Sequence, residues 1–350
     1  MVKISVDLGE RSYEVVVGEG VRTQLASLIA LRAPRAERVA IVTSSSLRAQ
    51  PWFDFEVGLA TSILELPDGE QAKRPEHYVA LVEALAERSL SRHDVVVGVG
   101  GGAITDVAGF AAATYLRGVP VIHVATTVAG QVDAAIGGKT GVNLRTGKNL
   151  LGAFHQPLGV LCDLATLHTL PERERRAGMG EVVKCALLEA QSSAWLARSS
   201  FESQMELAIA LKARLVASDE REGSSRALLN YGHTLAHALE REAMVRSDVS
   251  LRHGEAVAIG LAFAARLARA VGRLDDRGVA EHDAALNIFQ LPTRVPSVFD
   301  SSALLEAMSH DKKAHHDLTF VLAGAEGFSV VSGLAPDVVR TALDQFRGES

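Results

Sequence analysis

The sequence predicts two domains: an α/β N-terminal domain of Rossmann-like type with a parallel sheet, and a mainly α-helical C-terminal domain. The 350 residues exceed the roughly 250–300 that one hydrophobic core usually fills. Short β-branched runs alternate with helical patterns in the first half, whereas Ala/Leu/Arg-rich helical stretches dominate from Leu170-Pro171 to about residue 310. We therefore place an N-terminal domain at 1–170 and a C-terminal domain at 171–350, and expect the active site in the interdomain cleft.

The strands of the first domain are predicted from short runs rich in Val, Ile and Thr. Residues 1–7 alternate apolar and polar, as a strand does, and the other runs are Val15–Val17, Val39–Thr43, Val95–Val99 and Val119–Val124. Helical patterns cover Tyr78–Ser89 and Thr105–Ala113, and a later strand is expected at Leu318–Leu322. Strands that alternate with helices are typical of βαβ units and a parallel sheet.

Composition restricts the classes of partner. The formal net charge of -6 argues against nucleic acid or an anionic membrane as the main partner, because both need an extended basic surface. Cys162 and Cys185 are too few for a disulfide framework, and the apolar stretch Ala256–Ala265 falls short of the ~20 residues of a spanning helix. The chain start does not resemble a signal peptide. We expect a cytoplasmic protein with reduced thiols and a small-molecule substrate.

Lysine is scarce, since the 36 basic residues comprise 28 Arg and 8 Lys. One lysine, Lys212, shares a helical stripe with Met205, Ile209 and Val216. An amine on an otherwise apolar face usually has a partner or a function. Each lysine is therefore a candidate for a specific role, whereas the cluster His310–Lys313 taken alone is typical of a solvated charge run.

Two glycine-rich segments are candidates for phosphate binding. The run Val95–Ala103 leads from a strand through Gly98, Gly100, Gly101 and Gly102 into a helical pattern, where glycines let the backbone approach a pyrophosphate. No acidic residue follows about 20 positions on, so the standard dinucleotide fingerprint is incomplete and a packing turn is the alternative. Residues 130–152 are expected to form a loop rich in backbone N–H groups and cations.

The segment Glu222–Glu240 carries a row of polar groups. Glu222, Arg226, Asn230, His233 and His237 are spaced by four, four, three and four residues, which predicts one helical stripe opposite an apolar face. His233 and His237 have the spacing of zinc proteases, but Thr234 replaces the general-base glutamate of that class, which excludes a protease.

Further metal ligands lie elsewhere in the chain. His253 is expected to open the next helix, and Glu181 lies three residues before Lys184 on a helix expected to start near Gly180. A His/His/Glu set with an open position is typical of catalytic zinc. Spacing alone leaves open whether these side chains meet, and a structural role for each histidine is the alternative.

Together these motifs resemble the 3-dehydroquinate synthases of the sugar-phosphate cyclase group. The resemblance runs from Pro67–Gln71 to Asp311–Lys313. Its strongest stretches are Gly100–Gly118, Gln131–Gly141, Gly147–Asn149, Gly152–Pro157, Gly180–Lys184, Leu229–His237 and His253–Ala256. Several ordered motifs in one chain are far more specific than any single motif.

The resemblance implies a set of site residues. Glu181, His233 and His253 would bind zinc, with cobalt as an alternative metal. NAD would be held by Asp68, Gly69, Glu70, Gln71, Lys73, Gly102, Ala103, Ile104, Thr105, Asp106, Thr126, Thr127, Lys139, Lys148, Thr166, Leu167, His168 and Thr169. The catalytic and substrate-binding set would be Asp133, Lys139, Asn149, Lys184, Lys212, Arg226, Asn230, His237 and Lys312, with Arg117 reaching into the partner's site of a homodimer.

The reaction that the resemblance implies is that of a phosphorus-oxygen lyase of the shikimate pathway to aromatic amino acids. It converts 3-deoxy-D-arabino-heptulosonate 7-phosphate to 3-dehydroquinate and phosphate by NAD-dependent oxidation, phosphate elimination, re-reduction and intramolecular aldol cyclisation. The alternatives are a related cyclase making aminodehydroquinate or a cyclitol precursor, a metal-dependent polyol dehydrogenase, and a chain that has kept the fold without catalysis.

The sequence departs from the commonest pattern of this family at several positions. Ser44 stands where members often place Asp or Asn near the adenine ribose, and Gly180 where Ala often precedes the metal-binding Glu. Ala125 and Ala236 are further departures, and the segment after Lys313 lacks the usual Gly and Arg. These changes concern the ribose contact and the Lys312 loop, not the residues implied to bind the metal.

Overall fold

The computed structural model describes residues 1–246, 249–310 and 318–349. The chain divides into two compact units: unit 1 comprises Met1–Pro171 and Ile209–Arg221, and unit 2 comprises Glu172–Ala208 and Glu222–Ser350. Helix α7 (Phe201–Ser218) therefore contributes to both units. The predicted domain boundary at residue 170 and the cleft between domains stay predictions.

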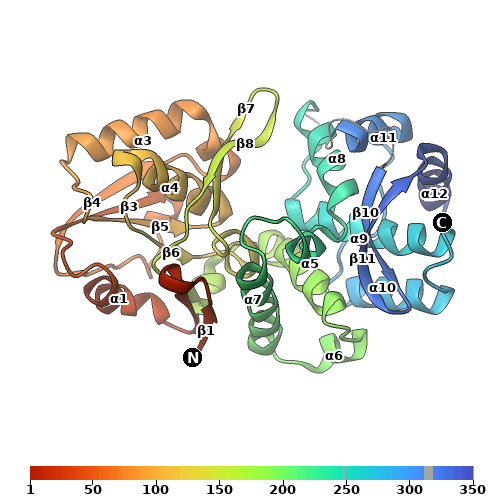
Figure 1. Cartoon of the computed structure of the whole chain (residues 1–350), viewed down its shortest axis with the longest axis horizontal. Helices are drawn as coiled ribbons and strands as arrows, with labels where there is room; N and C mark the ends of the chain where they lie inside the picture. The colour runs from red at the N-terminus through yellow and green to blue at the C-terminus, as the bar shows by residue number, and fades with distance from the viewer. Residues whose placement is uncertain (247–248, 311–317, 350) are drawn as a thin grey trace. The chain divides into compact units, whose positions relative to one another are not determined.

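Unit 1 is built on a seven-stranded sheet of order β1-β2-β9-β6-β5-β3-β4 (Figure 1). All neighbours are parallel except β1 and β2, which pair antiparallel. The strands are β1 (Val2–Val6), β2 (Tyr13–Gly18), β3 (Arg38–Ser44), β4 (Ala60–Leu66), β5 (Val95–Gly100), β6 (Val121–Ala125) and β9 (Val160–Asp163). The predicted strands of the first domain and its α/β class are confirmed.

Each face of this sheet has its own hydrophobic core, because successive strand residues point to opposite faces. Along β5, Val96 belongs to the core shared with α3 (Pro75–Glu87) and α4 (Gly102–Thr114), whereas Val95 and Val97 belong to the core shared with α1 (Leu25–Arg32). Short connecting elements are η1 (Gly9–Arg11), η2 (Val21–Gln24), α2 (Ser45–Arg48), η3 (Gly69–Lys73), η4 (Tyr115–Arg117) and η6 (Leu164–Thr169). The sheet is thus covered on both sides, as parallel sheets usually are.

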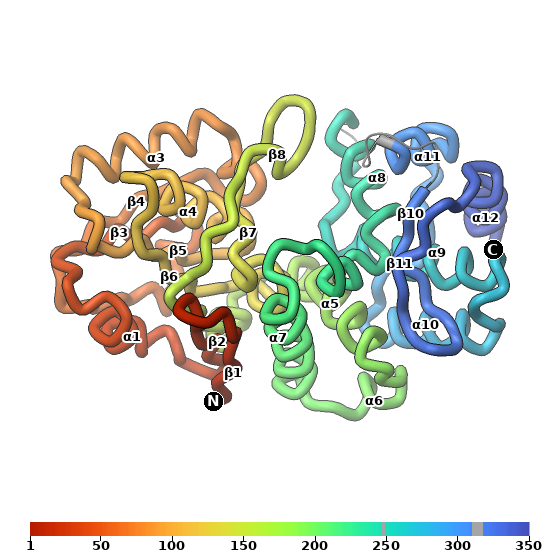
Figure 2. Tube along the Cα trace, viewed as in Figure 1, coloured from red at the N-terminus to blue at the C-terminus, as the bar shows by residue number. Residues whose placement is uncertain are grey.

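The expectation of a loop over residues 130–152 is wrong. The segment folds into a short π-helix, η5 (Gly130–Ala134), and an antiparallel hairpin of β7 (Lys139–Leu144) and β8 (Gly147–Phe154) (Figure 2). A Cβ on Gly152 would lie 2.1 Å from the Thr140 carbonyl oxygen, and one on Gly141 would lie 2.8 Å from the Leu151 carbonyl oxygen. These glycines therefore permit close pairing of two strands, a use that composition alone does not distinguish from a loop.

Unit 2 is mainly helical, as predicted. Its helices are α5 (Glu172–Leu188), α6 (Ser193–Arg198), the start of α7, α8 (His233–Met244), α9 (His253–Ala270), α10 (Asp276–Ile288), α11 (Ser301–His310) and α12 (Pro336–Gly348), with a hairpin of β10 (Leu318–Gly324) and β11 (Gly327–Leu334). Helix α9 is the core element, because nearly every residue from Gly254 to Ala268 is buried. None of the helices among the described residues is long and apolar enough to cross a membrane.

Two local predictions for unit 2 are wrong. Residues 222–240 are not one helix: a 3-10 segment, η7 (Ser225–Asn230), ends at a turn where Gly232 has φ +78°, and α8 starts at His233. The left-handed backbone at Gly232 interrupts any continuous stripe. Helix α5 begins at Glu172 rather than near Gly180.

Candidate active site

Three side chains that the sequence proposes as metal ligands lie together in unit 2. Ligand atoms of Glu181, His233 and His253 all lie within 4.8 Å of one another. His253 Nε2 is 3.0 Å and His233 Nε2 is 3.5 Å from Glu181 Oε1. Glu181 projects from the middle of α5, and the two histidines are the first residues of α9 and α8.

Glycines on α9 explain why these three helices meet so closely. A Cβ on Gly254 would lie 1.8 Å from the Ala177 carbonyl oxygen of α5, and one on Gly260 would lie 1.9 Å from the Gly232 carbonyl oxygen just before α8. Both distances are far below van der Waals contact, so only glycine permits these approaches. The backbones of α5 and α8 are thereby brought to the helix that carries His253.

The outer nitrogens of both histidines are occupied. His233 Nδ1 donates to the Tyr231 carbonyl oxygen at 3.1 Å, and His253 Nδ1 donates to Glu240 Oε2 at 3.3 Å. Each Nε2 therefore faces Glu181. This arrangement, with Nδ1 bonded outward and Nε2 directed inward, is the one that metal-binding histidines adopt.

Burial and charge set the protonation of the cluster. Burial alone would raise the pKa of Glu181, but Lys184, His233 and His253 lower it well below its ordinary range. Burial, with Lys184 nearby, lowers the pKa of His233 to about 3, so this imidazole is neutral. Burial opposes protonation of His253 also, but bonds to Glu181 and Glu240 raise its pKa to about 10.

The glutamate of the cluster is suited to a cation. Glu181 Oε2 is buried and accepts no well-directed hydrogen bond, although Lys184 Nζ lies 2.5 Å away as an ion pair. A carboxylate oxygen and two imidazole nitrogens are ligands that zinc prefers. The donor set therefore fits a divalent metal.

Other residues of unit 2 that are implied to bind substrate lie close to His233 in the sequence, and their side chains differ in exposure. Arg226 is almost completely buried at 1% exposure, whereas His237 is exposed, with its ring centroid 5.4 Å from that of His233. Asn230 Nδ2 donates to Glu222 Oε1 at 3.0 Å. A buried guanidinium and an exposed imidazole suit recognition of an anion.

The site residues implied for unit 1 form two further groups. Lys212, which was predicted to lie on an apolar helix face, is buried on α7 together with the apolar residues of that face. It forms an ion pair with Asp133 of η5. Lys73 is buried at 3% exposure, lies 2.5 Å from Asp106 Oδ2 and donates to Asn149 Oδ1. The structure thus brings together Lys73 and Asp106, implied to hold NAD, and Asn149, implied to contact substrate.

The glycine turn after β5 lies at the carboxyl edge of the sheet, where nucleotides bind in this fold class. A Cβ on Gly101 would lie 2.8 Å from Thr127 Cγ2, and one on Gly102 would lie 2.9 Å from Ala134 Cβ. Among the described residues, the buried hydroxyls of Thr43 and Thr126 have no hydrogen-bond partner. Close backbone packing and two orphaned hydroxyls at this edge fit a dinucleotide.

Near the end of β3, Ser44 stands where related sequences often have Asp or Asn, and its side chain is linked through Ser46 to the carboxylate of Asp68. Ser44 Oγ lies 3.3 Å from Ser46 Oγ, which donates to Asp68 Oδ1 at 2.5 Å. Arg117 is exposed and has φ +67°. The remaining implied residues occupy η3, the start of α4, the hairpin β7–β8 and η6; Lys312 lies outside the described residues.

Sequence reasoning missed two residues of the metal cluster's surroundings. Tyr231 acts through its backbone carbonyl, and any residue type could supply that group. Glu240 could have been found, since His233, His237 and Glu240 follow at the i, i+4, i+7 spacing of one helix face.

Comparison with protein families decides the assignment of the chain. Residues 63–177 match the 3-dehydroquinate synthase N-terminal model, and residues 178–314 match the 3-dehydroquinate synthase C-terminal model. The chain belongs to the 3-dehydroquinate synthase family. The resemblance drawn from the sequence motifs is confirmed.

Two relatives within this family are similar over almost their whole length. A protein of Amycolatopsis mediterranei (strain S699), provisionally named an aminodehydroquinate synthase, is 46% identical, and the match covers 99% of this chain and 95% of the relative. The 3-dehydroquinate synthase of Mycobacterium leprae (strain TN) is 43% identical, covering 95% and 91%.

Two solved structures share the fold. A 2-deoxy-scyllo-inosose synthase complexed with carbaglucose-6-phosphate, NAD+ and Co2+ has a TM-score of 0.83 at 25% identity, covering 99% of this chain and 100% of that one. A 2-epi-5-epi-valiolone synthase from Streptomyces hygroscopicus subsp. jinggangensis 5008, with NAD+ and Zn2+ bound, has a TM-score of 0.81 at 26% identity, covering 98% and 99%. The 3-dehydroquinate synthase family member described here therefore shares its architecture with cyclases of several products.

Proposed function

We propose that this family member is a 3-dehydroquinate synthase that converts 3-deoxy-D-arabino-heptulosonate 7-phosphate to 3-dehydroquinate and phosphate, with NAD and zinc or cobalt as cofactors. The observation that carries this proposal is the cluster of Glu181, His233 and His253, with the buried Lys184 against its glutamate. Both structural relatives named above were solved with NAD+ and a divalent metal, which supports the same cofactors here.

The three cluster residues would hold the metal, and the carboxyl edge of the unit 1 sheet would hold NAD. When bound, the metal supplies Lewis-acid polarisation of a substrate hydroxyl, and NAD supplies reversible acceptance of a hydride. The chain's own contribution is to bind and orient the substrate. The carboxylate of Glu181 is kept ionised by the ammonium of Lys184.

The substrate carries a phosphate and a carboxylate, so binding requires several cations in a protein whose formal net charge is -6. Arg226 would bind the carboxylate through its planar guanidinium, because two parallel N–H donors match two carboxylate oxygens. Lys139, Lys184 and Lys212 would serve as point charges, and Asp133, paired with Lys212, would accept a hydrogen bond from a substrate hydroxyl. His237 and Asn230 would add polar contacts. We infer that the departing phosphate itself takes the proton during elimination.

The test is phosphate release from the heptulosonate phosphate in the presence of NAD and zinc. We expect phosphate without accumulation of NADH, and a loss of more than about 100-fold on Glu181→Gln, because losing a ligand costs more than losing its support. Glu172→Gln, at an exposed position on the same helix, is the matched control. Stoichiometric NADH from a simple polyol, with no phosphate release, would instead identify a dehydrogenase.

A second candidate is the amino analogue of the same reaction, favoured by the 46% identity to the relative provisionally named an aminodehydroquinate synthase. Its substrate keeps the carboxylate, so Arg226 suits both. Comparing kcat/KM for the two substrates and for a sugar phosphate without the carboxylate decides between them. Arg226→Lys should weaken turnover of both carboxylate substrates while leaving the third nearly unchanged.

We also propose a homodimer in which Arg117 contacts the partner's active site. Leu116 beside it, and Leu150, Leu151 and Phe154 of β8, are exposed, and exposed large apolar side chains are available for a subunit contact. Cys162 and Cys185 are buried and form no disulfide, which supports a reducing, cytoplasmic setting. Sedimentation velocity tests the dimer, and a monomer at micromolar concentration would contradict it.

A further inference from the structure

We propose that Glu240 is a positioning residue for the metal ligand His253, fixing its ring so that Nε2 faces Glu181. This inference rests on the metal site of the proposed function. Glu240 lies on α8 and is buried at 8% exposure, and its Oε2 accepts the Nδ1 proton of His253 at 3.3 Å. A buried carboxylate is costly unless it is paired, so its placement against an imidazole requires an explanation.

The two histidines of the cluster are supported differently. His233 donates to the neutral backbone carbonyl of Tyr231, whereas His253 donates to a carboxylate. An ionised acceptor makes a stronger hydrogen bond and raises the basicity of the ligating nitrogen. His253 is therefore the more strongly donating imidazole, and Glu240 is the residue that makes it so.

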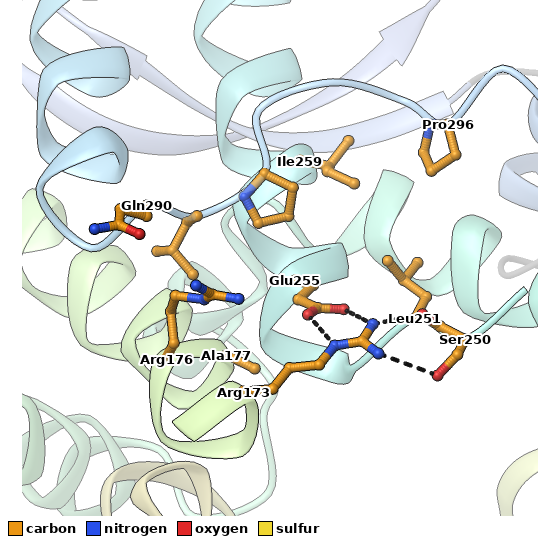
Figure 3. A pocket seen from close by; sticks show the side chains of 11 residues that line it. Arg173, Arg176, Ala177, Ser250, Leu251, Glu255, Ile259, Gln290 and Pro296 are labelled. Atoms are coloured by element: carbon orange, nitrogen blue, oxygen red, sulfur yellow. Dashed lines mark hydrogen bonds and ion pairs between the residues drawn. The ribbon is translucent and has the colours of Figure 1, made fainter. Parts of the chain in front are cut away.

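Glu240 acts on the ring, because the backbone of His253 is fixed separately. The hydrogen bonds that fix this backbone involve Arg173 and Glu255, which line a cavity of about 370 Å3 (Figure 3). Arg173 donates from Nε to Glu255 Oε1 and from Nη2 to Glu255 Oε2, both at 2.8 Å. The Arg173 Nη2 group also donates to the Ser250 carbonyl oxygen at 2.6 Å. The Arg252 backbone N–H donates to Glu255 Oε2 at 3.0 Å. The chain is thus tied down on both sides of His253, and ring rotation is the freedom left for Glu240 to control.

The test measures zinc affinity by competition with a chromophoric chelator, and the rate of zinc loss to excess EDTA, on full-length protein. Glu240→Gln should weaken zinc binding by about 10–100-fold and speed its loss similarly. At saturating zinc, the substrate KM should stay within about twofold of wild type, because Glu240 contacts the ligand and not the substrate. Glu242→Gln, two residues further along α8, is the matched control and should bind zinc as wild type does.

The outcomes separate this inference from the proposed function. If the wild-type protein binds no zinc or cobalt, the proposed metal site fails. If wild type binds zinc and Glu240→Gln binds it equally well, or lowers the melting temperature of the metal-free protein without changing zinc affinity, Glu240 has only a structural role. Should Glu240→Gln not fold, Glu240→Asp decides: the shorter carboxylate should weaken zinc binding, and unchanged binding would overturn the inference.

Discussion

Replacing Gly254 by alanine tests whether close helix packing sets the geometry of the metal cluster. A Cβ at this position would lie 1.8 Å from the Ala177 carbonyl oxygen, and ordinary contact begins near 3.4 Å. The backbones of α5 and α9 would have to separate locally by about 1.6 Å, since a carbonyl within a helix cannot move aside alone. Gly254 follows His253 directly, and Ala177 lies one helical turn before Glu181.

The displacement is large compared with what a metal site tolerates. Ligand distances in protein metal sites stay within about 0.2 Å of their preferred values. In the unchanged protein, His253 Nε2 and Glu181 Oε1 are 3.0 Å apart. A separation of α5 and α9 would increase this distance by far more than that tolerance. We therefore expect Gly254→Ala to weaken zinc binding by about 100-fold or more, a larger effect than losing a hydrogen-bonded support. Overpacking should also cost about 1–3 kcal/mol of stability.

The assay is a zinc competition titration together with urea unfolding of the metal-free protein. Gly348→Ala on α12 is the control, because a Cβ there meets no atom within 4 Å and should leave both quantities near wild type. A Gly254→Ala variant that binds zinc within twofold of wild type and unfolds at the same urea concentration would show that the helix contact does not set the site.

Two further predictions concern unit 1 and the dimer. Burial raises the pKa of Asp106 to about 6 although Lys73 opposes this shift. The contribution of protonated Asp106 to the free energy of unfolding is therefore fully present below about pH 4 and is lost as the pH rises through 6. Lys73→Met should raise that pKa further and cost up to about 2 kcal/mol more at pH 7.5 than at pH 5 in urea unfolding, because each pH unit above the wild-type pKa adds about 1.4 kcal/mol; an equal cost at both values would contradict the pairing. For the dimer, mixing inactive Arg117→Ala and Lys184→Ala proteins should restore about a quarter of wild-type activity, because one site of each mixed dimer is intact; no recovery would place Arg117 in its own subunit's site.

Sequence patterns predicted β3, β5 and β6 because these strands are buried on both faces and read as continuous apolar, β-branched runs, whereas β4 and β9 were not predicted. The same reasoning failed at residues 222–240, where the polar spacing suited a helix but one glycine with positive φ divides the segment. It failed again at the hairpin β7–β8, because glycines that permit close strand pairing look the same in sequence as glycines of a loop. Local pattern predicts an element's period, but not whether tertiary contacts interrupt it.

The metal cluster shows the corresponding limit for function. The residue types of Glu181, His233 and His253 are visible in the sequence, but their meeting depends on glycine contacts between helices far apart in the chain. Support of one histidine by a backbone carbonyl leaves no trace in side-chain identity. Glu240 does leave a trace, since it continues the helix face of His233, and a search for carboxylates at such spacing would have found it.

Three of the few lysines in the chain are buried and form ion pairs. Lys73, Lys184 and Lys212 are all nearly inaccessible, and each pairs with a carboxylate, namely Asp106, Glu181 and Asp133. A buried ammonium without a partner would lose its proton, and a buried carboxylate without one would gain it. Each pair therefore keeps both charges in place inside the protein, whereas a surface Lys such as Lys3, paired with the exposed Glu14, contributes little. The composition identified the lysines as candidates for a specific role. Only the folded structure shows the carboxylates that keep their side chains charged.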